Sequence, residues 1–516
     1  MPSAKPPDRT KKTTILMKRN IALLTATLLP SMAIAQKPNV IMIVADDLGY
    51  GDISCYGATR VSTPNVDDLA RRGVRFTNAH CVASTSTPSR YGMLTGMYPF
   101  RKPDTNIAAG DAAMIIRPYQ YTIADLFRDN GYHTAAIGKW HLGIGSTAGA
   151  QDWNGVIDQT PNDLGFDYSY LMAATADRVP CVFIEQGRVA NYDPAYPIRV
   201  SYQKPLEGEI TYPMTPQGEL KLKSSHGHNN AVVNGIGRIG YMTGGGKALW
   251  KDQDIADSIT AHALQYIGQH RDKPFFLYLA TNDIHVPRYP HDRFRGNNPM
   301  GFRGDAISQF DWTVGQVTAK LDELGLTDNT LIILTSDNGP VLDDGYQDQA
   351  PELAGSHRPG GHMRGGKYSS FEAGSTIPFI VTWPGQTPRG KVSNALFSQI
   401  DIMGSFAQLL QAKLPSGAGI DTRPTLRAMM GKSCKGAKYN ISMSANRSLT
   451  LRTPRWKYIQ PSNGVPLMKS VNIETGYSLQ EQLYDITNDP GETTNVAARY
   501  PKVVAKLKEI LLKNKK

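Results

Sequence analysis

Four apolar segments rich in β-branched and aromatic residues are spread over the first two thirds of the chain. They are NVIMIVADD (39–47), HTAAIGKWH (133–141), FFLYLATNDIH (275–285) and LIILTSDNG (331–339). Runs of this kind predict strands buried on both faces. Between them, TIADLFRDNG (122–131) and DSITAHALQYIGQH (257–270) repeat apolar residues every three or four positions, which predicts helices. This alternation predicts an α/β fold in which helices sandwich a large, mostly parallel sheet.

Each of the four predicted strands ends in polar residues that catalytic and metal sites use. These residues are Asp46 and Asp47, Lys139 and His141, His285, and Asp337 and Asn338. In parallel sheets, ligands bind outside the carboxyl ends of the strands. We therefore expect these side chains to gather at one edge of the sheet.

The pattern changes after about residue 415, where the segments become shorter. NISMSANRSLTLRT (440–453) and WKYIQPS (456–462) are typical of exposed antiparallel strands. The last segment places apolar residues on one helical face and lysines on the other. We expect a catalytic domain over residues 36–415 and a small C-terminal α+β subdomain, with an antiparallel sheet, over residues 416–516.

The composition is that of a globular protein, with 40% hydrophobic and 20% charged residues in a chain of 516. The formal net charge of +11 lies mostly at the two ends of the chain. Residues 1–35 carry six basic residues and one acidic residue, and residues 501–516 carry six lysines and one glutamate. The body between them is close to neutral, so we expect no nucleic-acid partner.

The basic N-terminal end has its own explanation. Lys18 and Arg19 precede the apolar run IALLTATLLPSMAIA, which ends in the small-residue pattern Ala33-Ile34-Ala35. This arrangement predicts a signal peptide over residues 1–35, cleaved before Gln36, with Met17 as an alternative start. The run is too short for a membrane anchor. The protein is therefore expected to be exported, periplasmic or secreted, without a stable membrane anchor.

The cysteines do not define a framework. Cys55, Cys81, Cys181 and Cys434 are too few and too scattered for a disulfide scaffold or a CxxC zinc site. Two alternatives remain for these cysteines: one disulfide bond, or buried free thiols.

The oxygen-bearing side chains at the strand ends suit a hard cation. Asp46, Asp47, Asp337 and Asn338 supply three carboxylates and an amide oxygen. Calcium prefers such a set, whereas zinc favours histidine or thiolate. A single Asp pair is more often a turn or a helix cap, but two pairs at strand ends of one sheet predict a site for one calcium ion.

The segment STPSRYGMLTG (86–96) combines a helix start with an unusual motif. Thr87 is expected to cap the helix and Pro88 to take its first position, which leaves Ser86 at an anion-attracting N-terminus. The segment resembles the sulfatase signature, a cysteine or serine followed by fixed residues. Those places are filled by Ser86, Pro88, Ser89, Arg90, Leu94, Thr95 and Gly96.

Other segments resemble the same family in the same order, from about residue 37 to 500. They are PNVIMIVADDLGYGD, TPNVDDLARRGVRFTNAH, IGKWHLG, SDNGP, RGGKYSSFEAG, TPRWKYI and LYDITNDPGETTNVA. The chain is thus identified as similar to the type I formylglycine-dependent sulfatases of the alkaline phosphatase superfamily, bacterial serine type. The resemblance implies that residue 86 joins the calcium ligands. It also implies a set of residues around the sulfate, namely Arg90, Lys139, His141, His285 and Lys367.

The same resemblance implies that Ser86 is oxidised to formylglycine (3-oxoalanine). A serine that attacked a sulfate ester would become a stable serine sulfate, whereas the hydrated aldehyde can expel sulfate by C–O cleavage. The cationic side chains and calcium are expected to stabilise the sulfuryl oxygens. His285 is expected to protonate the leaving sugar oxygen and His141 to act as base. Because residue 86 is serine, the implied partner is the anaerobic radical maturase of bacteria.

The segment ATADRVPCVFIEQGRV (174–189) resembles sulfatases that act on sulfated galactose or N-acetylgalactosamine. Asp177 and Arg178 are expected either to hold sugar hydroxyls or to form a loop salt bridge. The expected substrate is a sulfated glycan, with the 6-O position favoured. Two alternatives remain: a phosphonate or phosphate monoester hydrolase of the same superfamily, and an unmodified, catalytically silent protein that binds sulfated glycans.

Overall fold

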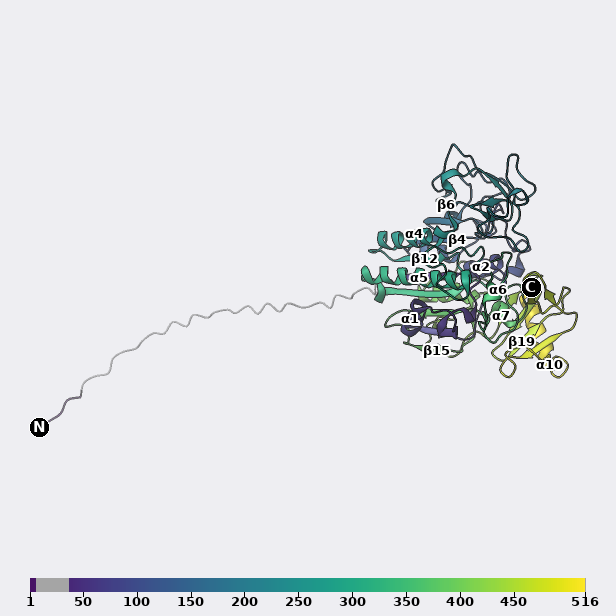
Figure 1. The fold of residues 1–516 in the computed structure, drawn as a ribbon. Coiled ribbons are helices and arrows are strands. Elements are labelled where there is room, and N and C mark those ends of the chain that lie inside the picture. The colour runs from purple at the N-terminus through teal and green to yellow at the C-terminus, as the bar shows by residue number, and fades with distance from the viewer. Residues whose placement is uncertain (6–36, 516) are drawn as a thin grey trace. The chain divides into compact units, whose positions relative to one another are not determined.

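The four apolar segments form the centre of a ten-stranded sheet in the computed structural model of the chain (Figure 1). They are adjacent and parallel, in the order β13 (Thr330–Ser336), β1 (Asn39–Ala45), β12 (Phe275–Ala280) and β4 (His133–Lys139). Every residue of β1, β12 and β13 is buried. Strands with both faces covered need continuous apolar sequence, which is the pattern that these segments show.

Six further strands extend the sheet on both sides. They are β2 (Val74–Phe76), β5 (Tyr168–Met172), β6 (Phe183–Glu185), β7 (Arg188–Val189), β14 (Phe379–Thr382) and β15 (Lys391–Ser393). The full order is β15-β2-β14-β13-β1-β12-β4-β5-β6-β7. The four central strands are parallel to one another, and the antiparallel pairs are those of β14 with β13 and β2 and those of β6 with β5 and β7. The predicted α/β class, with a mostly parallel sheet, is confirmed.

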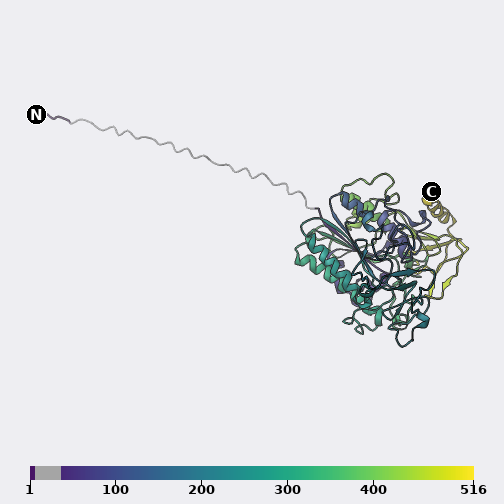
Figure 2. The ribbon, with the colours of Figure 1, turned by 90° about the horizontal axis from the view of Figure 1, so that it is seen from above.

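Helices cover both faces of the sheet because successive side chains of a strand point to opposite sides. Ile41 and Ile43 belong to one apolar core and Val40 and Met42 to another. The first core includes residues of α1 (Pro64–Arg72), α4 (Ile255–Gln269) and α5 (Gly301–Glu323). The second includes residues of α2 (Ser86–Thr95), α3 (Ile123–Asp129) and α8 (Ile402–Leu409). Figure 2 shows helices on either side of the central strands. Both predicted helices are present as α3 and α4.

A four-stranded antiparallel sheet follows near the C-terminus. Its strands are β17 (Asn440–Met443), β18 (Leu449–Arg452), β19 (Trp456–Ile459) and β22 (Gln482–Asp485). The expectation that these strands are exposed was wrong, because β17 and β18 are fully buried. The final helix α10 (Pro501–Lys515) packs against β18 and β19 through Leu507 and Leu511. Met443 bridges to Ala83 beside the predicted catalytic segment.

The remaining elements are short. The strands are β3 (Ala79–His80), β8 (Arg199–Ser201), β9 (Val232–Val233), β10 (Ile236–Gly237), β11 (Tyr241–Thr243), β16 (Phe397–Ser398), β20 (Leu467–Met468) and β21 (Ile473–Glu474). The helices are α6 (Ala350–Leu353), α7 (Glu372–Ser375) and α9 (Leu426–Met429).

The structure describes residues 1–5 and 37–515, so the predicted signal peptide lies almost wholly outside the described residues. Residues 37 onward form one compact unit. The boundary at residue 415 therefore stays a prediction. All four cysteines have free thiols. In the part of the chain that is described, no helix combines the length and the apolar character needed to span a bilayer.

Candidate active site

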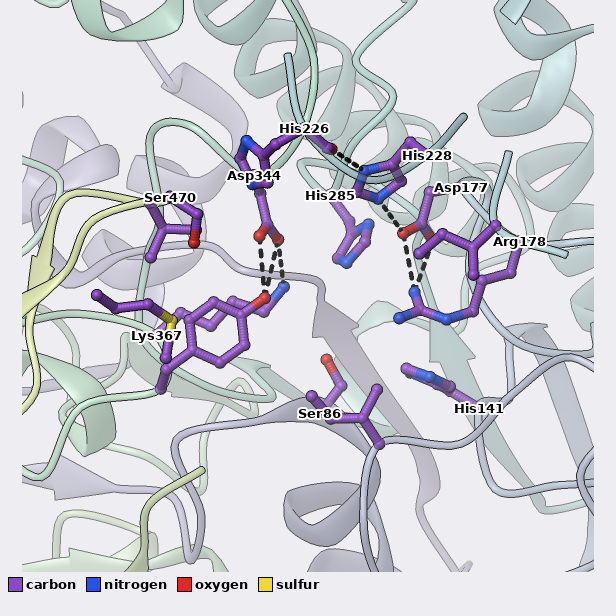
Figure 3. Close-up of a pocket in the computed structure, with 15 residues that line it drawn as sticks. Ser86, His141, Asp177, Arg178, His226, His228, His285, Asp344, Lys367 and Ser470 are labelled. Carbon is purple, nitrogen blue, oxygen red and sulfur yellow. Dashed lines mark hydrogen bonds and ion pairs between the residues drawn. The ribbon is translucent and has the colours of Figure 1, made fainter. Parts of the chain in front are cut away.

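Helix α2 begins at Ser86, at the floor of a pocket above the carboxyl ends of the central strands (Figure 3). The expectation that Thr87 caps this helix was wrong. Thr87 lies inside the first turn, where its hydroxyl donates to the His141 carbonyl at 2.9 Å and accepts from the Ala108 backbone at 3.1 Å. These bonds fix the start of the helix to the loop after β4.

The Ser86 hydroxyl contacts two of the predicted site residues. Lys139 Nζ lies 3.1 Å from Ser86 Oγ, and Ser86 Oγ lies 3.1 Å from Asn338 Oδ1. Lys139 ends β4 and Asn338 follows β13, so residues 252 positions apart in the sequence meet at one hydroxyl. All three side chains are nearly inaccessible to solvent.

The three predicted aspartate ligands lie together beside this serine. The Asp47 backbone donates to Asp337 Oδ1 at 3.2 Å, and Asn338 Nδ2 donates to Asp47 Oδ1 at 2.7 Å. Asp46 Oδ1 accepts from Lys139 at 2.6 Å. Arg90 closes the group through its ion pair with Asp337, at 2.8 Å. The carboxyl ends of β1 and β13 thus meet as the sequence predicts.

The electrostatics of this group favour a bound cation. Burial raises the pKa of Asp46 well above its usual range, and the neighbouring Asp337 and Asp47 raise it further against the effect of Lys139. Asp46 Oδ2 is buried without a hydrogen-bond partner. An unpaired buried carboxylate oxygen is costly unless a proton or metal ion satisfies it. The donor set therefore fits a hard metal ion.

The acidic and histidine side chains that lie close enough to share a metal ion are not all among the predicted ligands. Among the described residues, ligand atoms of Asp46, Asp47 and His285 lie within 4.8 Å of one another. Asp337 is outside that group, and its Oδ2 is paired with Arg90. Burial raises the pKa of Asp337, but the positive charges of Arg90 and Lys139 lower it by more. The pKa therefore lies below its usual range, and the carboxylate stays ionised.

Two site residues adopt backbone conformations that non-glycine residues rarely take. Asp47 has a φ of 58° and His141 a φ of 56°. Such left-handed residues cost free energy and concentrate at functional sites. Each lies shortly after a central strand; the Asp47 side chain contacts Lys367, and His141 lines the pocket.

Both predicted catalytic histidines line the pocket in defined orientations. His141 Nε2 lies 3.0 Å from the Ala108 carbonyl and His285 Nδ1 lies 2.7 Å from the Val286 carbonyl. Because carbonyls only accept, these nitrogens carry protons and leave His141 Nδ1 and His285 Nε2 as the free positions. Burial, then Lys139, lowers the pKa of His141 far below its usual range. Burial and Lys367 lower the pKa of His285 to about 4.

Lys367 reaches the same site from a loop before α7. Its Nζ donates to Asp47 Oδ2 and to Asp344 Oδ2, each at 2.8 Å. Burial lowers the pKa of Lys367, but Asp344 and Asp47 raise it more, so the ammonium is held charged. Tyr368 also donates to Asp344, at 2.9 Å. Sequence reasoning missed Asp344, although the acidic pair after SDNGP was a visible signal.

Asp177 and Arg178 lie across the pocket from Lys367 and Asp344 (Figure 3). They form an ion pair at 2.8 Å, and His228 Nε2 lies 2.8 Å from Asp177 Oδ2. The expected salt bridge and the expected pocket position therefore both occur. His228 belongs to the HGH segment at 226–228, and His226 of the same segment also lines the pocket.

The C-terminal part of the chain completes the pocket wall. Met468, Ser470 and Val471 line it from the hairpin of β20 and β21. The pocket encloses about 230 Å³, enough for a small polar ligand rather than a polymer chain. No sequence pattern marked this hairpin, because its contribution depends on how it folds back over the strand ends.

Comparisons with known proteins agree with this geometry. A model of the sulfatase family matches residues 38–412. The chain is 51% identical over 477 residues to an N-acetylgalactosamine-6-O-sulfatase of Bacteroides thetaiotaomicron, covering 92% of this chain and 93% of that protein. It is 29% identical to human arylsulfatase A, over 95% of this chain and 90% of that protein.

A solved structure is also similar throughout. Its description concerns the metabolism of multiple glycosaminoglycans by Bacteroides thetaiotaomicron, and it matches with a TM-score of 0.91 and 50% identity, covering 93% of this chain and 100% of that chain. The fold and the buried serine–lysine–aspartate site thus define a hydrolase of sulfuric esters. The chain belongs to the sulfatase family. This family uses a formylglycine and a metal ion.

Proposed function

We propose that this sulfatase removes 6-O-sulfate from N-acetylgalactosamine, or from galactose, in glycans. The high identity to an N-acetylgalactosamine-6-O-sulfatase along nearly the whole chain supports this substrate class. The observation that carries the reaction is the Ser86 hydroxyl at the pocket floor, bonded to Lys139 Nζ and Asn338 Oδ1. An ester oxygen placed there would meet the buried cations of the site.

Ser86 is the proposed precursor of the formylglycine. One calcium ion is proposed to lie among Asp46, Asp47, Asp337 and Asn338, next to residue 86. When both groups are present, the formylglycine supplies an attacking hydroxyl and calcium stabilises its deprotonated form. The orphaned Asp46 Oδ2 and the raised pKa of Asp46 support a bound cation.

The buried cations have a separate proposed task. Arg90, Lys139 and Lys367 are each at most 3% exposed, and each is held by an aspartate. Preorganised charges in a site that excludes water stabilise developing negative charge without having to reorient. We assign these three side chains to the sulfuryl oxygens.

The histidines are proposed to move protons. His141 carries its proton on Nε2, so the unpartnered Nδ1 is free to accept one, as a base requires. His285 turns Nε2 toward the pocket. It is proposed to take up a proton at Nε2 when the anionic sulfate ester enters the site, and to pass that proton to the leaving sugar oxygen. Asp177 and Arg178, on the opposite wall, are proposed to hold sugar hydroxyls.

Two further proposals concern the cell. We infer that residues 1–35 direct export to the periplasm or the medium, where sulfated glycans are accessible. The conversion of Ser86 is assigned to a radical maturase that acts under anaerobic conditions, before export.

A panel of sulfated monosaccharides tests the reaction. Purified protein from a host with the maturase is incubated with the 4-O- and 6-O-sulfates of N-acetylgalactosamine and galactose, and released sulfate is measured. We expect turnover of the 6-O-sulfates and none by Ser86→Ala. Phosphate and phosphonate monoesters form a second arm. Faster turnover of those esters than of any sulfate ester would overturn the proposal.

The mass of the Ser86 peptide tests the modification. Formylglycine lies ~2 Da below serine because two hydrogens are lost. Finding only unmodified serine in active protein would refute the proposed nucleophile. Unmodified serine in inactive protein that still binds sulfated sugars would instead support a silent binding protein.

A further inference from the structure

A second hollow of about 230 Å³ lies beside the active pocket. Ile107 lines both hollows, and Thr85, the residue before Ser86, lines the second one. The second hollow therefore begins next to the proposed nucleophile. Its far wall comes from the turn between β17 and β18, which brings Ser444 and Arg447 to it.

Arg447 is held in place by acceptors on the facing loop. Its NH1 donates to Asn106 Oδ1 at 3.1 Å and to the Pro103 carbonyl at 3.3 Å, and its NH2 donates to the Lys102 carbonyl at 3.2 Å. These acceptors are uncharged. Within residues 37–515, no carboxylate lies close enough to Arg447 to form an ion pair. The guanidinium is thus ordered while its charge is uncompensated.

Other cationic side chains in the neighbourhood differ in this respect. Arg101 is paired with Asp421 at 2.7 Å, and Lys102 is paired with Asp104. Among the residues that line the second hollow, Arg447 has the cationic side chain, and this side chain is only partly exposed. A half-buried, preoriented guanidinium without a counterion is suited to bind an anionic group from a ligand.

Ile107 provides a surface between the two hollows. Its side chain is 42% exposed, which is high for a large apolar residue bordering a buried site. The apolar face of a sugar ring can cover such a side chain. A sugar that passes over Ile107 leaves the active pocket and arrives at Asn106 and Arg447.

We propose that the second hollow binds the sugar next to the sulfated one, and that Arg447 recognises an anionic group on that sugar. The group is either a uronate carboxylate or a second sulfate ester. This inference rests on the proposed function for the position of the first sugar. It makes Arg447 a residue that determines specificity, without a part in the chemical step.

Four substrates with the same 6-O-sulfated sugar test the proposal. One is the monosaccharide, one carries a neutral second sugar and one carries a uronic acid; a fourth, with a sulfated second sugar, separates the two anions. We expect Arg447→Ala to lower kcat/KM on the acidic disaccharides about tenfold or more, as is typical for a lost bond to a charged group. Turnover of the monosaccharide and of the neutral disaccharide should stay within about twofold of the parent enzyme.

Two control variants separate recognition from structure. Arg455→Ala removes an exposed arginine between β18 and β19 of the same sheet, paired with Asp485 and outside both hollows, and should leave turnover of all four substrates unaffected. Arg447→Lys keeps the charge and should restore part of the preference for acidic disaccharides. If Arg447→Ala slows all substrates equally, Arg447 only supports the loop and the proposal is wrong.

The outcomes also separate this proposal from the proposed function. If the parent enzyme releases no sulfate from any of the four substrates, the assignment of the reaction fails. If it hydrolyses the monosaccharide but does not distinguish acidic from neutral disaccharides, only the second-sugar site fails.

Discussion

Asp344 and Lys367 form an ion pair on the pocket wall, with Asp344 Oδ2 2.8 Å from Lys367 Nζ. Both side chains are buried, and Lys367 also contacts Asp47 in the metal group. Asp344 therefore connects the pocket wall to the proposed calcium ligands. Its position explains how a buried lysine stays charged before a substrate arrives.

Asp344→Asn tests this connection. The amide keeps the shape but loses the charge that holds Lys367, so we expect kcat to fall about tenfold because the ammonium is less well positioned. Steady-state kinetics on a 6-O-sulfated monosaccharide measure the change. Asp343→Asn alters the neighbouring, partly exposed residue and should leave kcat unchanged. Equal kinetics for both variants would refute a role for Asp344 in positioning.

Metal removal should affect both stability and activity. A ligand that binds only the folded state at 100 times its Kd stabilises that state by about 2.7 kcal/mol. We expect a chelator to lower the Tm and abolish turnover, and calcium to restore both. Asp46→Asn should remove the calcium-dependent part of the Tm shift. A Tm that is independent of calcium in the parent protein would contradict the assigned site.

Asp52 should contribute to stability above about pH 4. It accepts from Arg303 at 2.6 Å and lies 2.7 Å from His357. Although burial raises its pKa, Arg303 and His357 lower it to about 2, from 3.8 in the unfolded chain. A lowered folded pKa gives stability that is complete above pH 3.8 and is lost as the pH falls toward 2. The shift corresponds to about 2 kcal/mol.

Urea unfolding between pH 2.5 and 5 measures this contribution. Asp52→Asn should be less stable than the parent protein over this whole pH range, because Arg303 is left unpaired. Its free energy of unfolding should also fall less as the pH is lowered, because the titrating carboxylate is gone. Asp272→Asn, at an 88% exposed carboxylate, should keep the parent pH dependence. An unchanged slope in Asp52→Asn would show that the carboxylate titrates normally.

The packing of α10 predicts unequal effects of two similar substitutions. Leu507 is 3% exposed against β18 and β19, and Leu512 on the same helix is 53% exposed. Leu507→Ala should lower the free energy of unfolding by about 2–5 kcal/mol, and Leu512→Ala by less than about 0.5 kcal/mol. Denaturant melts compare the two. Similar losses would mean that α10 does not pack as described.

The sequence was sufficient for the centre of the fold. The four apolar runs could be recognised as buried strands because a strand covered on both faces tolerates few polar residues, and β1, β4, β12 and β13 occupy those runs. The strand ends were also predictable, since parallel strands bring their carboxyl ends to one edge. Asp46, Lys139 and Asn338 accordingly meet beside Ser86.

Other residues of the site could not be predicted from the local sequence pattern. Asp344, His228 and Ser470 lie in loops with no periodicity, and only the folded chain brings them to one pocket. The same limitation led to the wrong expectation that β17 and β18 are exposed, because their alternating sequence does not reveal what covers them. In the structure, Arg452 of β18 is buried against Glu372.

The sequence by itself thus determined the class of fold, the serine motif and the kind of side chain at each central strand end. These features can be read from residues that are close in the sequence. The spacing of apolar residues indicates which segments are buried strands, and parallel strands bring their carboxyl ends to the same edge of the sheet. The tertiary structure alone decided that Asp344 holds Lys367, that the β20–β21 hairpin forms a pocket wall and that Arg447 faces a second hollow. Those contacts join segments up to hundreds of residues apart, and their free energy depends on a geometry that exists only after the chain has folded.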